Sequence, residues 1–75
     1  MHPNQVRARL MEQGLSYRQW ALARGFDPHA VAQVVRRYAG ASTLPRGRQS
    51  YRILRDLSRT IGQEVTPGVL RGDGL

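Results

Sequence analysis

The sequence predicts a single, compact all-α domain of four to five helices over residues 1–75. Apolar residues recur three and four positions apart, which is the spacing of one helix face. Capping residues and glycines divide the chain into segments of helical length. No two alternating runs are joined by a hairpin turn, so no sheet is expected. A chain of this length buries only about 60% of its unfolded surface, which allows one modest core.

The first two helices are predicted at residues 4–13 and 17–24. The first would bury Val6 and Leu10, with Met11 and Leu15 close by, and would end at Gly14. The second would begin at a capping box, because the hydroxyl of Ser16 and the side chain of Gln19 can each accept a hydrogen bond from the other residue's backbone N–H. It carries Trp20 and Ala21 and would end at Gly25.

A third helix is predicted over residues 28–39, because Asp27 is a good N-cap and Pro28 is well tolerated in a first turn. Its apolar residues form one stripe, Val31, Val34, Val35 and Tyr38, whereas its opposite face carries His29, Gln33 and Arg36. Valine lowers helix propensity, so a strand over residues 31–38 is the alternative. The helical spacing favours the helix.

The remaining chain predicts a loop at residues 40–47 and a fourth helix at residues 48–61. This helix would bury Ile53, Leu54, Leu57 and Ile61, and would show Arg52, Arg55 and Arg59 to solvent. Asp56 lies at helical spacing from Arg52 and Arg59, so ion pairing with either is an alternative to ligand binding by this stripe. Thr66 and Pro67 predict a short turn over residues 66–70, and we expect residues 71–75 to fray.

Charge is the most informative part of the composition. The formal net charge is +7, and all twelve cationic side chains are arginine. Six of them lie between Arg36 and Arg55, a stretch with no acidic residue. Such a local positive field favours a nucleic-acid partner, since the planar guanidinium grips phosphates and guanine edges with two hydrogen bonds. The alternative explanation for the arginine content is the codon bias of a GC-rich genome.

Several classes of function are not expected. No apolar run approaches the roughly 20 residues of a membrane span, and no secretion signal is visible, so we expect a cytoplasmic protein without a membrane partner. Cysteine is absent, and His2 and His29 are too distant in sequence to suggest a metal site. No carboxylate pair or Ser-His arrangement suggests catalysis. We therefore expect no enzyme, cofactor or small-molecule substrate.

Two short helices separated by a glycine turn are the motif that carries a function. Counted from Gly25, small or apolar residues stand at the positions that fix two crossing helices, namely Trp20, Ala21, Phe26, Val31 and Val34. Ala21 would lie at the closest approach of the helices, and Gly25 would permit the positive φ of the turn. The pattern is similar to a helix-turn-helix DNA-binding unit, whose second helix lies in the major groove.

The chain from Val6 to Leu70 resembles the lambda-repressor-like family, and within it the Ner-like regulators of transposable phages. The resemblance rests on Leu15-Ser16, Ala21, Gly25, Val31, the Pro45-Arg46-Gly47 loop and the stretch from Ile61 to Pro67. Arg24 stands where such units usually carry an apolar residue. The resemblance implies that bases are read by His29, Gln33, Arg36 and Arg37. Phosphate contacts are expected from Ser16, Tyr17, Arg18, Arg46, Arg48, Tyr51 and Arg52.

The function expected from this resemblance is sequence-specific binding of double-stranded DNA. The protein would be a transcriptional regulator of phage or prophage origin that represses by covering a promoter. We expect a homodimer, at least on DNA, and Val69, Leu70 and Leu75 are candidate pieces of its seam. Two alternatives stay open: a small basic interaction protein of the antitoxin or inhibitor type that docks on an acidic partner, and an RNA-binding module. Trp20 and Tyr38 could stack on unpaired bases, but their spacing favours the core.

Overall fold

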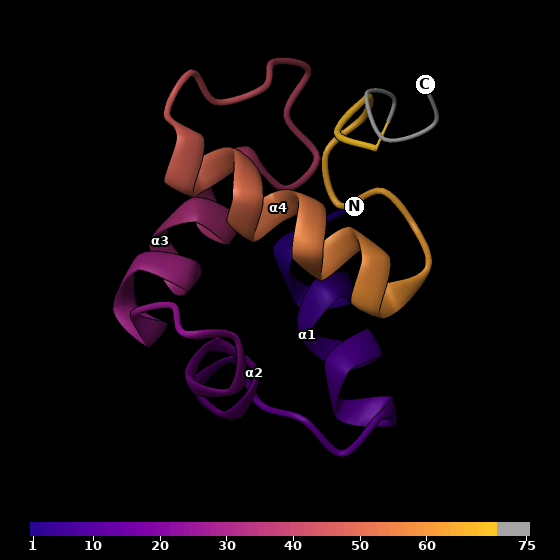
Figure 1. Cartoon of the computed structure of the whole chain (residues 1–75). Coiled ribbons are helices and arrows are strands. Elements are labelled where there is room, and N and C mark those ends of the chain that lie inside the picture. Colours follow the sequence, from indigo (N-terminus) through magenta and orange to yellow (C-terminus); the bar gives the residue numbers. More distant parts are fainter. Residues whose placement is uncertain (71–75) are drawn as a thin grey trace.

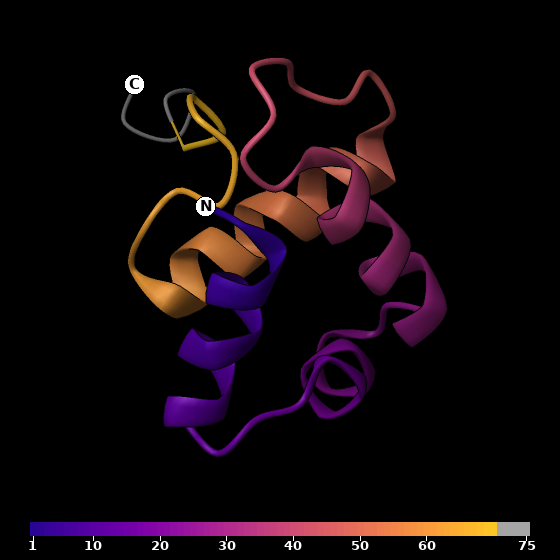
Figure 2. The same cartoon turned by 180° about the vertical axis from the view of Figure 1, so that it is seen from behind.

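The computed structural model describes residues 1–70 and confirms the all-α class. Figure 1 and Figure 2 show four helices: α1 (Pro3–Glu12), α2 (Tyr17–Arg24), α3 (Pro28–Tyr38) and α4 (Arg48–Ile61). The boundaries agree with the sequence prediction to within one residue. Residues 31–38 are helical, so the strand alternative is wrong. The prediction for residues 71–75 lies outside the described part of the chain.

Local capping explains where α1 and α2 begin. In α1, Nδ1 of His2 accepts a hydrogen bond from the N–H of Asn4, and Oε1 of Gln5 accepts one from the N–H of His2. The capping box predicted for α2 is present between Ser16 and Gln19. These bonds satisfy N–H groups that a helix start leaves without partners.

One apolar core joins the four helices and the segment that follows them. α3 packs against α1, α2 and α4, and Figure 1 shows α4 lying across α1 and α3. The core comprises Val6, Leu10, Trp20, Ala21, Val31, Val34, Val35, Ile53, Leu54, Leu57, Val65 and Val69. Two expectations need correction. The side chain of Met11 does not lie beside this core but is 62% exposed, and Ile61 is only partly buried.

The segment after α4 folds back and is held by buried polar contacts. The hydroxyl of Ser58 donates to the carbonyl of Leu54 at 2.7 Å and accepts from the N–H of Val65 at 2.9 Å. The hydroxyl of Thr66 donates to the carbonyl of Tyr38 at 2.9 Å. These contacts connect the end of the described chain to α3 and α4.

Residues 66–70 form the expected turn, in which the N–H of Val69 donates to the carbonyl of Thr66. This turn buries the side chain of Val69 completely in the core of the domain. Leu70 is partly buried, and Leu75 lies outside the described residues. No helix within residues 1–70 has the length and apolar character needed to cross a bilayer.

Candidate nucleic-acid interface

The helices α2 and α3 form the predicted helix-turn-helix arrangement. Gly25 ends α2 in the left-handed region, with φ of +79°, and the N–H of Phe26 donates to the carbonyl of Ala21 at 2.8 Å. Ala21 is completely buried, and the rings of Trp20 and Phe26 stack with their centroids 5.7 Å apart. The turn is therefore fixed by backbone geometry and by packing on both of its sides.

A polar contact also attaches α2 to the far end of α4. The indole Nε1 of Trp20 donates to the hydroxyl of Thr60 at 2.9 Å, and that hydroxyl donates in turn to the carbonyl of Asp56. A guanidinium nitrogen of Arg24 lies 3.2 Å from the same hydroxyl, and the guanidinium carbon lies 5.9 Å from the centroid of the Trp20 ring. These contacts explain how Arg24 fits at a position that is usually apolar in similar units.

The outward face of α3 is exposed along its length. His29, Gln33, Arg36 and Arg37 are all exposed, whereas Val31 and Val35 on the other face are buried. Gln33 Nε2 lies 3.3 Å from His29 Nε2, which is within hydrogen-bond distance. Neither arginine forms an ion pair within residues 1–70. The four residues that the resemblance assigns to base reading are therefore accessible, and three of them line one helical face.

A groove beside this face is lined by an arginine that the sequence analysis did not include in the site. It lies between the starts of α1 and α2 and the middle of α3, and it is lined by Asn4, Arg7, Tyr17, Ala32 and Arg36 among others. Arg7 is not among the residues predicted from the sequence. It lies ten and 29 positions from Tyr17 and Arg36, and no local pattern connects residues so far apart. Their proximity follows only from the packing of α1 against α3.

The start of α2 supplies donors next to this groove. The hydroxyl of Ser16 is occupied by the N–H of Gln19, but the N–H groups of Tyr17 and Arg18 form no hydrogen bond within residues 1–70. The side chain of Arg18 is exposed and shares a shallow groove with Arg7. Free N–H groups at the positive end of a helix bind phosphate oxygens. Ser16, Tyr17 and Arg18 therefore lie together, as expected for a phosphate-binding element.

The position of Tyr17 in the site perturbs the ionisation of its phenol. Burial raises the pKa of its phenol above the usual value of 10.0, and the nearby charge of Arg7 partly opposes this shift. The hydroxyl of Tyr17 donates to the carbonyl of Pro3 at 3.2 Å, which connects α2 to the start of α1. The neutral phenol is therefore the form that this fold favours.

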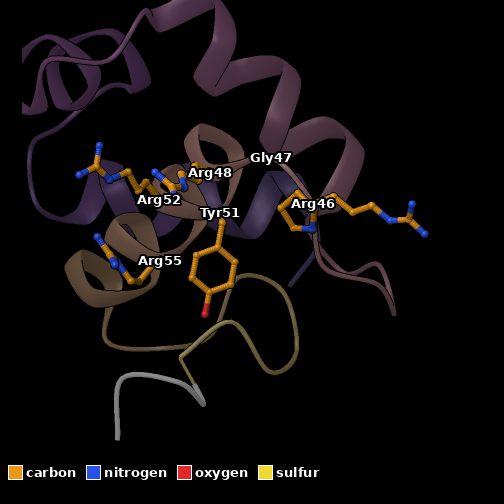
Figure 3. Close-up of a pocket in the computed structure, with 7 residues that line it drawn as sticks. Arg46, Gly47, Arg48, Tyr51, Arg52 and Arg55 are labelled. Carbon is orange, nitrogen blue, oxygen red and sulfur yellow. The ribbon is translucent and has the colours of Figure 1, made fainter. Parts of the chain in front are cut away.

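The side chains of the remaining predicted phosphate-binding residues point in two different directions. Arg46, Arg48, Tyr51 and Arg52 all line a groove of about 400 Å³ at the start of α4. Figure 3 shows that Arg46 points to one side, whereas Arg48, Arg52 and Arg55 point to the other. Arg46 also lines a second groove with Arg37 at the end of α3. Arg46 thus extends the α3 surface, and the arginines of α4 point in another direction from the same groove.

Tyr51 and Asp56 have structural partners within this region. The hydroxyl of Tyr51 donates to the carbonyl of Val69 at 2.8 Å, so its donor hydrogen is already used. Asp56 pairs with its neighbour Arg55 at 3.5 Å and forms no ion pair with Arg52. Arg52 is exposed and forms no ion pair within residues 1–70. The charge of Arg52 is therefore not neutralised by the domain itself.

The part of the chain that the structure describes brings no three His, Cys, Asp or Glu side chains together as metal ligands. Comparison of the chain with protein-family models, with curated proteins and with solved structures found no match. The relation to the lambda-repressor-like family is therefore still a resemblance in sequence pattern.

Proposed function

We propose that this protein is a transcriptional regulator that binds double-stranded DNA through α3. The observation that carries the proposal is the exposed face of α3, with His29, Gln33 and Arg36 one turn apart on the second helix of a helix-turn-helix unit. An α-helix fits the major groove of B-DNA, where each base pair presents a distinct set of donors and acceptors. The net charge of +7 supports an anionic partner.

Each exposed side chain of α3 has a role in this proposal. The guanidinium of Arg36 donates two hydrogen bonds to O6 and N7 of guanine, and the amide of Gln33 pairs with N6 and N7 of adenine. The contact between Gln33 and His29 orients the amide before DNA arrives. His29 itself accepts from or donates to a base edge, depending on its tautomer.

Phosphate contacts on both sides of α3 set the register of the helix in the groove. On one side lie Arg7, Arg18 and the free N–H groups at the start of α2. On the other side lie Arg37 and Arg46, which line a common groove at the end of α3. Such contacts carry no sequence information, but they hold the reading helix at one depth and angle.

The proposed mode of regulation is repression by occlusion, in the manner of a phage or prophage repressor. A single module of this kind covers about 600–1,000 Å² of its own surface on DNA, which gives limited specificity. We therefore propose that two copies bind repeated or palindromic half-sites, at least on DNA. The proposal includes no cofactor and no catalytic step.

Selection of bound duplexes from a random pool tests this function directly. We expect an enriched motif, and a two-fold motif would also establish two copies per site. Arg36→Ala should relax the preference at one base pair by about 1–3 kcal/mol, whereas Arg46→Ala should weaken binding to all duplexes alike. Arg9→Ala is the matched control, since Arg9 is exposed on α1 outside these grooves. A pool without an enriched motif, or equal effects of Arg36→Ala and Arg9→Ala, would refute the proposal.

A further inference from the structure

We propose that an arginine row on α4 binds the phosphate backbone of a second DNA duplex, so that the protein bridges two DNA segments. The row comprises Arg48, Arg52 and Arg55. Binding of the first segment is the function proposed above for α3, and the inference rests on it. The row points in a different direction from Arg46, and Arg46 and Gly47 line both its groove and the groove at the end of α3.

The row results from the helical repeat of α4. Its three members are four and three residues apart, and they lie opposite the fully buried Ile53 and Leu57. At 1.5 Å per residue the row is about 10 Å long, which corresponds to roughly three phosphates along the axis of one strand. The row therefore extends over a length comparable to that of a few phosphates of one strand.

The groove next to the row supplies further donors for phosphate oxygens. Gly47 is the N-cap of α4 and provides no side-chain cap. The N–H groups of Arg48, Gln49 and Ser50 form no hydrogen bond within residues 1–70. Pro45, which is buried, fixes the loop that forms the other wall. Guanidinium groups thus line an open groove at the helix start where these N–H groups lie.

The orientation of the row indicates a second segment and not a continuation of the first. α3 and α4 pack against each other, and each turns its charged face away from the core that they share. The groove beside Arg36 and the groove beside Arg52 have no lining residue in common, whereas the groove at the end of α3 meets the groove beside Arg52 at Arg46 and Gly47. In Figure 3 the side chains of the row point away from Arg46, the residue that extends the α3 surface.

Charge argues for DNA as the occupant of this surface. A second copy of the chain would present the same arginines, and like charges repel. Within the row only Arg55 has a carboxylate partner, at 3.5 Å, whereas Arg48 and Arg52 form no ion pair within residues 1–70. The planar guanidinium of arginine can donate two parallel hydrogen bonds to a phosphate group, and it therefore fits phosphate better than a compact ammonium group does.

A co-capture experiment with the full chain tests the proposal. One short duplex that carries the selected motif is immobilised, the protein is added, and capture of a second, fluorescent duplex of unrelated sequence is measured. We expect capture by the unmodified protein and an at least tenfold weaker capture by Arg52→Glu, because a phosphate contact is replaced by repulsion. Arg9→Glu, the matched charge reversal on α1, should capture normally. Capture of the second duplex is compared between the proteins at equal amounts of protein bound to the immobilised duplex.

The outcomes separate this proposal from the proposed function. Failure of the unmodified protein to bind the first duplex would refute DNA binding by α3. Normal binding of the first duplex without capture of the second would refute the bridging proposal alone. Capture that persists in Arg52→Glu would show that bridging comes from protein dimers, and equal losses in Arg52→Glu and Arg9→Glu would show a general effect of net charge. Either result would also overturn the assignment of the row. Arg52→Gln is the substitute if Arg52→Glu does not fold.

Discussion

The side chain of Ser58 offers a sharp test of how the chain after α4 is held. Ser58→Ala removes the hydroxyl that accepts the hydrogen bond of the Val65 N–H, and both residues are completely buried. A buried donor without a partner costs about 1–3 kcal/mol, and the better helix propensity of alanine returns at most about 0.5 kcal/mol. We expect the free energy of unfolding to fall by about 1–2.5 kcal/mol. For a domain of this size that is a fall in Tm of roughly 5–20 °C.

Urea unfolding followed by the fluorescence of Trp20 measures this change, because Trp20 is the single tryptophan and is buried. Ser50→Ala is the matched control, since it makes the same substitution elsewhere in α4 and cancels the propensity term. A difference below about 0.5 kcal/mol between the two variants would refute the reasoning. It would mean that the Val65 N–H finds another partner or that water reaches it.

Three further changes test the helix-turn-helix unit. Ser16→Ala should cost about 1 kcal/mol by removing the cap of α2, measured by thermal unfolding with Gln49→Ala as an exposed control. Gly25→Ala should cost about 1–2 kcal/mol and Gly25→Asn less, because no atom lies within 4 Å of a Cβ there and the whole penalty is the positive φ; equal costs would contradict this. The raised pKa of Tyr17 implies a contribution to stability that is complete below pH 10 and is lost as the pH rises through the pKa of the folded state. Tyr17→Phe should therefore flatten the alkaline decline in stability, and an unchanged decline would exclude Tyr17 as its source.

The helices could be predicted from the sequence because their signals are local. Ser16 with Gln19, and Asp27 with Pro28, satisfy the N–H groups of their own first turns, and Gly25 and Gly62 adopt the positive φ that ends a helix. The spacing of apolar residues then fixes which face is buried. The capping box of α1 was missed because its cap is a histidine, which uses a ring nitrogen in place of the usual hydroxyl or carboxylate oxygen.

The contacts between distant parts of the chain could not be predicted in the same way. Trp20 reaches Thr60 across 40 positions, and Thr66 reaches Tyr38 across 28. Likewise the exposed face of α3 follows from its periodicity, but the position of Arg7 beside Arg36 depends on how two helices pack. The different directions of Arg46 and the α4 row also could not be predicted, because Arg46 lies in a loop before the helix that carries the row.

The exclusive use of arginine limits how these two faces could be switched off. A guanidinium stays protonated throughout the physiological pH range, so a change in acidity would not discharge the surfaces. With no lysine in the sequence, acetylation of ε-amino groups also has no side chain on which to act. Release from a polyanion would therefore depend on ionic strength or on competing nucleic-acid strands. The affinity would then be set by the composition of the solution and not by a change in the charge of the arginine side chains.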